Sequence, residues 1–190
     1  MLLSPVGHKH IILRSTSTNT ATLIDGGRCK GGNCGGTTGK PALIYIPPGT
    51  YSLSKTVQLL INTQIIGDAV NMPTLKASNS FSSGSAVINA YDDGQPSTNN
   101  FYIGVRNVKL DTTAVSSDQE IYGLNWAVSQ ATNLINVHFE MATDSQHVGI
   151  EMIGGDSGGG SGLFMGDLSF HGGNVGILFS NQQYAIRNAR

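Results

Sequence analysis

The sequence predicts an all-β protein, a right-handed parallel β-helix in which short strands stack into a solenoid. The first observation behind this prediction is composition, since the chain has 25 Gly among 190 residues and only 12% charged residues. Gly and Asn accept the positive φ angles of tight turns, so such a composition favours many turns between short strands. The second observation is a set of short apolar runs. The third is an internal repeat with a spacing near 26 to 31 residues.

Short apolar runs rich in Val, Ile, Tyr and Thr begin at Pro41 and predict strands in order along the chain. The first three predicted strands are residues 42–46, 49–53 and 63–66. Pro47 and Pro48 predict a corner, because proline cannot donate to the hydrogen-bond ladder of a central strand. The first nineteen residues or so show no clear period and predict no element.

The repeat consists of two interleaved series in the second half of the chain. Apolar-Gly-apolar triplets place Gly123, Gly149 and Gly176 at intervals of 26 and 27 residues. An Asn or Asp recurs between these triplets, near the start of an apolar strand. Its positions are Asn107, Asn136, Asp167 and Asn188. Two series mean that each coil contributes at least two strands, and the Asn or Asp predicts a corner where its side chain bonds to the backbone.

Alternation within the repeated strands assigns side chains to the inside and the outside of the solenoid. Stacked coils place Val108, Val137 and Leu168 in one buried column. The residues that face the other way are Lys109, His138 and Ser169. A solenoid needs several coils and capped ends, but the last strand, residues 184–190, reaches the C-terminus without a cap. We therefore expect a partial domain. A β-sandwich would show turns every 8–12 residues or so without this longer period.

Charge and hydropathy argue against two classes of partner. Eleven basic and 12 acidic residues give a net charge of −1 without a basic cluster, so no nucleic-acid binding is expected. No stretch approaches the roughly eighteen apolar residues of a transmembrane helix, so no membrane partner is expected. The start, MLLSPVGHKHIILRS, is too short and polar for a signal peptide. Either the protein is cytosolic, or the chain begins inside a longer protein whose signal lies upstream.

The two cysteines, Cys29 and Cys34, lie in the Gly-rich stretch RCKGGNCGG. A disulfide that closes so short a loop contributes about 2 kcal/mol in the chain-entropy model. Free thiols are the alternative; the disulfide is favoured, and it points to a secreted protein. No second Cys pair or paired His follows at ligand spacing, so no metal site is predicted.

Carboxylates are the first candidates for chemistry, because β-helices often act on polysaccharides, yet composition singles out no pair. The candidates are Asp92, Asp93, Asp111, Glu120, Glu140, Glu151, Asp156 and Asp167. Asp111, Glu140 and His171 follow equivalent strands and are predicted to stack on one face, where solvated corner residues are the simpler interpretation. His138 and His147 lie at no catalytic or metal-ligand spacing and are interpreted as surface or turn residues.

Two further features each allow two interpretations. Residues 154–162, GGDSGGGSG, resemble a phosphate-cradling loop in glycine content alone, without the Gly-Lys-Ser/Thr ending, and predict a loop on one edge. Trp126, the only Trp, is either a sugar-stacking platform or a core side chain.

Seven blocks of sequence follow one another in order. They are GGRC…C…PALIYIPPGTYSLS, TQIIGDAVNMPTLKAS, FYIGVRNVKLDTT, GLNWAVSQATNLINVHFEM, QHVGIEM, GSGLFMGDLSFHGGNVG and NQQYAIRN. Together they resemble the N-terminal β-helix of fungal exo-β-1,3-glucanases, family fifty-five of the glycoside hydrolases, within the pectate-lyase-like superfamily. The resemblance covers residues 19–190 and leaves residues 1–18 as an unmatched N-terminal segment.

The resemblance implies a secreted enzyme that removes glucose from the non-reducing end of β-1,3-glucan, with inversion and without a metal or other cofactor. It also implies a second β-helix domain, with the active site between the two domains. Gln130 and Ser161 match residues that hold the attacking water, and the GGDSGGG insertion makes Ser157 an alternative to Ser161. Trp126 and His147 lie in the same blocks and are expected to bind substrate.

The chain also departs from the family pattern, because the general acid is a Glu of the second β-helix. Inverting hydrolysis needs that acid and a base-activated water, with the two groups roughly 6.5–9.5 Å apart. We therefore expect this chain to supply the water side alone and to be inactive by itself. The alternatives are a non-catalytic β-glucan-binding or structural β-helix, and another polysaccharide enzyme on the same fold. A pectate lyase would need a cluster of acids for Ca²⁺, and none is visible.

Overall fold

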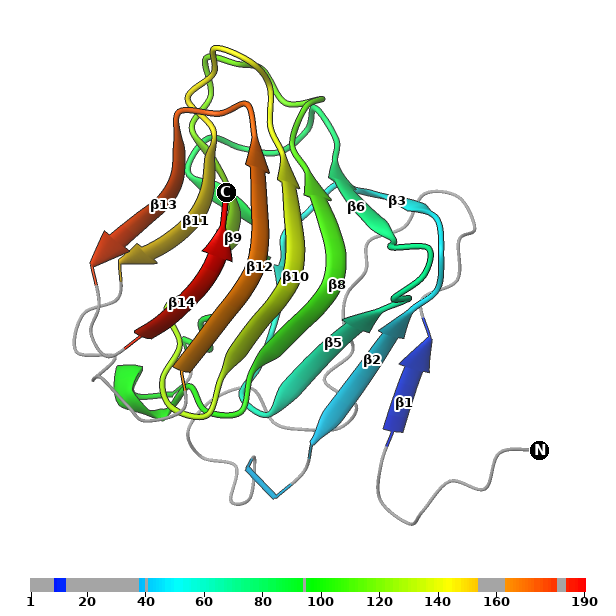
Figure 1. Ribbon diagram of the computed structural model, residues 1–190, viewed down its shortest axis with the longest axis vertical. Helices are drawn as coiled ribbons and strands as arrows, with labels where there is room; N and C mark the ends of the chain where they lie inside the picture. The colour runs from blue at the N-terminus through cyan, green and yellow to red at the C-terminus, as the bar shows by residue number, and fades with distance from the viewer. Residues whose placement is uncertain (1–8, 13–37, 40, 94, 154–162, 181–183) are drawn as a thin grey trace.

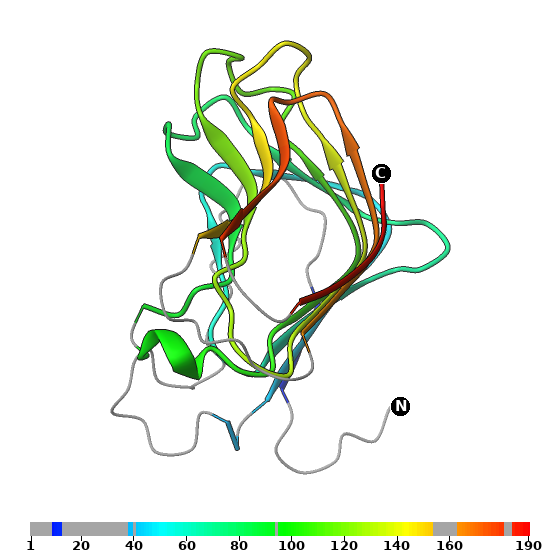
Figure 2. The ribbon, with the colours of Figure 1, turned by 60° about the vertical axis from the view of Figure 1, so that its left-hand side comes forward.

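Two parallel β-sheets wind around one shared interior (Figures 1 and 2) in the computed structural model, which describes residues 9–12, 38–39, 41–93, 95–153, 163–180 and 184–190. Sheet A consists of β1 (Lys9–Ile12), β2 (Ala42–Ile46), β3 (Thr50–Leu53), β5 (Thr63–Gly67), β6 (Thr74–Ala77), β8 (Gly104–Asp111), β10 (Asn133–Glu140), β12 (Leu163–His171) and β14 (Tyr184–Ala189). Sheet B consists of β4 (Val57–Gln58), β7 (Ser85–Asn89), β9 (Ile121–Asn125), β11 (Val148–Ile153) and β13 (Val175–Ser180). The predicted parallel β-helix is confirmed, as are the three predicted early strands.

The chain alternates between the two sheets, so strands of one sheet are neighbours from successive coils. β10 lies between β8 and β12 in sheet A, and β11 lies between β9 and β13 in sheet B. Each pair is parallel. Connections that lead from sheet A to sheet B therefore gather on one edge of the solenoid, and connections back to sheet A gather on the opposite edge (Figure 1).

The long strands of sheet A bend at the recurring Asn or Asp. In β8, residues 104–106 pair with β5 and residues 109–111 pair with β6, so one long strand covers two short ones. The residue at the bend has a left-handed backbone in each coil, with φ between 53° and 56°, at Asn107, Asn136, Asp167 and Asn188. Asn and Asp are the non-glycine residues that adopt this conformation most readily. The predicted corner is confirmed.

The side chains at these bends mostly bond between coils and not to the local backbone, which corrects the expected pattern. Asn136 Nδ2 donates to Asn107 Oδ1 at 2.9 Å. Asn188 Nδ2 donates to Asp167 Oδ1 at 2.9 Å. Among the described contacts of these four bend residues, one is to a backbone carbonyl: Asn107 Nδ2 lies 3.4 Å from the oxygen of Gly67. Stacked amides thus help to fix the register of neighbouring coils.

The predicted core column is present. Val137 pairs with Val108 on one side and with Leu168 on the other, and all three side chains are buried. Two positions further along, Phe139 stacks on Phe170 with ring centroids 4.8 Å apart and planes 10° apart. Each aromatic pair of this kind adds about 0.5–1.5 kcal/mol beyond its area burial.

The repeated glycines of sheet B face these rings across the interior. A Cβ atom on Gly123 would lie 2.7 Å from the Phe139 ring, and one on Gly149 would lie 2.6 Å from the Phe170 ring. Real Cβ atoms do not approach carbon atoms so closely. The glycine repeat therefore exists because aromatic side chains of sheet A occupy the space that a side chain would need.

The first end of the described solenoid contains a strand that the sequence did not predict, and the last coil is more exposed than the coils in the middle. β1 lies in the segment 1–18, where no element was predicted, and it pairs with β2. At the other end, Phe179 and Ile186 are 46% and 40% exposed. Their partners one coil earlier, Met152 and Met165, are fully buried. The last described coil thus leaves its apolar side chains partly uncovered.

Candidate functional site

Gln130 lies in a connection from sheet B to sheet A. Three such connections lie within the described residues, at the bottom of Figure 1: 59–62, 90–103 (without residue 94) and 126–132, which follow β4, β7 and β9. We call them the B-to-A edge. The Gln130 side chain is exposed there. Ser161 and its alternative Ser157 lie outside the described residues, as do Cys29 and Cys34. β11 and β12 are direct neighbours of β9 and β10, which flank Gln130.

A buried polar network holds this connection in place beneath Gln130. The backbone N–H of Asn100 donates to Ser129 Oγ at 3.2 Å, and the Ser129 N–H donates back to the Asn100 carbonyl at 3.0 Å. Asn100 Oδ1 accepts from the Asp92 N–H at 2.7 Å, and Thr132 Oγ1 donates to the Ser129 carbonyl at 3.0 Å. All four residues are buried. Gln130 therefore projects from a loop that is fixed on both sides, as a residue that orients a ligand requires.

Trp126 does not lie on the surface. Its side chain is fully buried and belongs to the hydrophobic core. The expected contact with substrate is therefore corrected, and of the two interpretations of this Trp the core side chain is the one that the structure supports. Trp126 directly follows β9, and its backbone N–H donates to the Glu151 backbone carbonyl at 2.7 Å. Its side chain therefore continues the inward-facing side of the strand.

His147 is also misplaced as a substrate-binding residue, because it is fully buried on the opposite edge of the solenoid. It lies in a connection from sheet A to sheet B, between β10 and β11. Its Nε2 faces the Ser116 carbonyl at 3.1 Å, and its Nδ1 lies 3.0 Å from Thr112 Oγ1. A carbonyl can only accept, so Nε2 donates its proton to the Ser116 carbonyl. His147 thus ties two successive connections together.

A row of polar side chains on the outer face of sheet B leads to the B-to-A edge, and sequence reasoning did not single it out. Register pairs Gln58 with Asn89, Asn89 with Asn125, and Asn125 with Glu151. Asn89 Nδ2 donates to Gln58 Oε1 at 2.9 Å, while Gln58 Nε2 donates to the Tyr91 carbonyl at 2.7 Å. The signal in the sequence was a polar residue at the end of β4, β7 and β9 and an equivalent one within β11, which is visible only once the strands are aligned.

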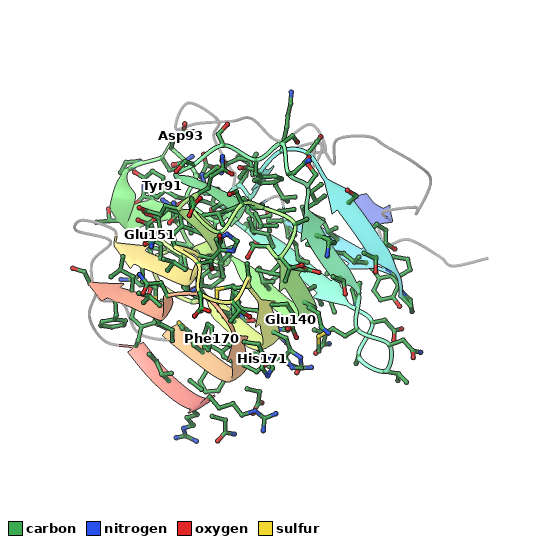
Figure 3. The ribbon with its side chains drawn as sticks, turned by 90° about the horizontal axis from the view of Figure 1, so that it is seen from above. Tyr91, Asp93, Glu140, Glu151, Phe170 and His171 are labelled. Carbon is green, nitrogen blue, oxygen red and sulfur yellow. The ribbon has the colours of Figure 1, made fainter. Side chains whose placement is uncertain are left out.

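Glu151 is the titratable residue of this row. Burial, and secondarily the nearby Glu120 carboxylate, raise the pKa of Glu151. The Tyr122 hydroxyl donates a hydrogen bond to Glu120 Oε1, and this bond and burial raise the pKa of the tyrosine. Figure 3 shows Glu151 on the same side of the molecule as Tyr91 and Asp93, which follow β7. The B-to-A edge and this row form one continuous candidate site.

A second group of charges lies on the outer face of sheet A, away from this site (Figure 3). The predicted stack is confirmed, since Glu140 pairs in register with Asp111 and with His171. Glu140 Oε1 lies 3.8 Å from Lys109 Nζ and 3.4 Å from His171 Nδ1. Exposed ion pairs of this kind contribute about 0–1 kcal/mol. These contacts match the interpretation of solvated corner residues.

The described residues contain no group of three or more His, Cys, Asp or Glu side chains arranged to hold a metal ion. Within the same residues, no helix has the length and apolar character needed to cross a membrane. The side chains of the B-to-A edge and its polar row include amides and carboxyl groups, which form hydrogen bonds. That chemistry suits hydroxyl-rich ligands.

These features define a class: a pectate-lyase-like parallel β-helix with a polar face along one edge. Residues 11–190 match the family described as rhamnogalacturonase A/epimerase, pectate lyase-like, and the chain belongs to that family.

Three curated relatives cover most of the chain. A probable glucan endo-1,3-beta-glucosidase of Arthroderma benhamiae is 41% identical over 183 residues, which are 91% of this chain and 20% of that protein. A glucan 1,3-beta-glucosidase of Cochliobolus carbonum is 36% identical over 178 residues, covering 88% of the chain and 22% of that protein. A non-secreted LysM effector of Penicillium expansum, LysM15, is 37% identical over 178 residues, covering 89% and 12%.

The expected relation to fungal glucan 1,3-β-glucosidases is confirmed by the first two relatives. The chain spans between 12% and 22% of the length of these three proteins.

Proposed function

We propose that this chain supplies the water-holding side of an exo-β-1,3-glucanase active site that works with inversion. In this proposal Gln130 and Ser161 orient the attacking water, the proton of that water passes to a general base, and a glutamate of a second β-helix protonates the leaving oxygen. The observation that carries the proposal is the exposed Gln130 on a rigid connection at the B-to-A edge. The 36% identity to a protein named glucan 1,3-beta-glucosidase supports it, and the 41% identical relative, named a probable glucan endo-1,3-beta-glucosidase, supports β-1,3-glucan as the substrate.

The geometry of inversion explains why one β-helix is half of such a site. The general acid and the general base that activates the water must lie on opposite faces of the sugar, with their carboxyl groups roughly 6.5–9.5 Å apart. In this proposal the B-to-A edge presents the water side. A second β-helix placed against the B-to-A edge would provide the other and would exclude water from the cleft between them.

The substrate and setting follow from the same proposal. The substrate is β-1,3-glucan, the product is glucose from the non-reducing end, no metal or other cofactor takes part, and the protein is secreted. The amides and carboxyl group of the polar row are suited to bind sugar hydroxyls along the solenoid axis, since successive coils lie about 4.8 Å apart.

A β-glucan-binding β-helix without catalysis is the second candidate function. It is favoured by one observation: the same residues match a relative named as a LysM effector at 37% identity, and not only proteins named as glucosidases. In that case Gln130 and the polar row would bind sugar, and no acid would be required from elsewhere.

Glucose release from laminarin tests the proposal, with the 190-residue chain compared to a longer chain that continues through a second β-helix. The short chain should release little glucose, because loss of a general acid removes about 10²–10⁴-fold of rate. In the longer chain Gln130→Ala should lower kcat by about 10²-fold, as expected for a misplaced water. The matched control is Gln146→Ala, an exposed glutamine on the opposite edge, which should leave kcat unchanged.

Three results would contradict the proposal. Rapid glucose release by the short chain would place the acid within these residues. A longer chain indifferent to Gln130→Ala would show that the water site lies elsewhere. Laminarin oligosaccharides in place of glucose would show endo-acting cleavage, the mode named for the Arthroderma benhamiae relative.

A further inference from the structure

Glu151 occupies an unusual position in the polar row of sheet B. Its register partner one coil earlier is Asn125, and its partner one coil later is Leu178, which has no polar group. Paired residues on one face of a sheet have Cβ atoms about 4.5–5.5 Å apart. The Glu151 carboxyl group therefore has one polar neighbour along the row, the amide of Asn125.

That amide contains a buried acceptor. Asn125 Oδ1 is buried and accepts no hydrogen bond in the part of the chain that the structure describes. The earlier amides of the row are satisfied, since Gln58 and Asn89 bond to each other and to nearby backbone. A buried acceptor without a donor costs about 1–3 kcal/mol. An ionised Glu151 would add a second acceptor beside it and would not relieve this cost.

The charges around Glu151 also oppose its ionisation. Glu120 is a second carboxylate close by, and the Tyr122 hydroxyl already donates to Glu120. The next strand, β13, contributes no titratable side chain. Among the described residues, no Lys, Arg or His forms a salt bridge with Glu151. Glu140 is the contrasting case, because it lies beside both Lys109 and His171.

We propose that Glu151 keeps its proton to a higher pH in the folded protein than in the unfolded chain, and donates it to Asn125 Oδ1. One proton then relieves three unfavourable features together: the unpartnered Asn125 oxygen, the repulsion from Glu120, and the partial burial of a charge without a counter-ion. Burial and Glu120 act in the same direction on the pKa of Glu151.

The competing arrangement is a rotated Asn125 amide that turns Nδ2 towards Glu151. That amide would donate to an ionised carboxylate and would lower the pKa of Glu151. The two arrangements therefore predict opposite displacements of the Glu151 titration, so one experiment separates them.

Carbon NMR of the glutamate carboxyl groups in the 190-residue chain, followed from about pH 3 to pH 8, measures the Glu151 titration. The Glu151→Gln variant assigns the signal. We expect the Glu151 midpoint above 4.5, the ordinary value of a glutamate, and we expect Glu120→Gln to lower it. A Glu151 midpoint at or below 4.5 would overturn the proposal.

Stability gives an independent readout with a definite sign. A carboxyl group whose pKa is raised on folding contributes stability below its ordinary value of 4.5, and this contribution is lost as pH rises through the raised pKa. Glu151→Gln donates to Asn125 Oδ1 at every pH. Its Tm should therefore rise relative to the unsubstituted chain as pH increases, whereas Glu140→Gln should show no such gain. A constant difference in Tm between Glu151→Gln and the unsubstituted chain across pH would count against a proton held by Glu151.

Discussion

Substitution of Gly149 by alanine tests the cross-interior packing of glycine against phenylalanine. The new Cβ would lie 2.6 Å from the Phe170 ring and 2.6 Å from the Gly176 carbonyl oxygen. Overpacking of this kind costs about 1–3 kcal/mol, and the restricted unfolded chain returns about 0.4–1 kcal/mol. We expect a net loss of about 1–2 kcal/mol, which lowers Tm by about 2–8 °C for a domain of this size.

Gly176→Ala is the matched control, one coil further along the same repeat. Its Cβ would meet the Phe170 ring at 3.4–3.6 Å, which is close to ordinary contact. Neither glycine has a positive φ, so backbone strain does not enter either substitution. Thermal unfolding followed by circular dichroism should show Gly176→Ala near or slightly above the unsubstituted chain. Equal losses for both alanines would refute the packing argument and assign the glycine repeat to backbone requirements.

Two further predictions concern the core and the cysteines. Val137→Asp places an unpaired charge between Val108 and Leu168 and should cost several kcal/mol; unchanged thermal stability would show that the rung register is wrong. Cys29 and Cys34 should be joined when the chain is produced by secretion, so mass spectrometry after alkylation without reductant should find neither thiol labelled; two labelled thiols would remove the main support in the sequence for the proposal that the protein is secreted.

Features that depend on one strand and its equivalents could be predicted from the sequence. The column of Val108, Val137 and Leu168 followed from alternation and repeat spacing, because parallel coils in register bring equivalent residues together. The bends at Asn107 and its equivalents followed from the conformational preference of Asn and Asp.

Features that depend on side-chain direction or on both sheets could not be predicted. Trp126 and His147 lie in blocks shared with known glucanases, but a shared block does not tell whether a side chain points inwards or outwards, and both are buried. The pairing of Gly149 with Phe170 joins residues of opposite sheets, which no periodicity within one series reveals. β1 was missed because four residues are too few for a period and its pairing with β2 is long-range.

The partly uncovered last coil has a consequence for how the solenoid opens. Each coil of a solenoid is stabilised by its neighbours, so stability varies along the axis and need not be lost in a single step. β13 and β14 have neighbours on one side alone within the described residues, and Phe179 and Ile186 remain partly exposed. Backbone amides of β13 and β14 should therefore exchange with solvent through local fraying, before those of β9 and β10, which lie between two neighbours.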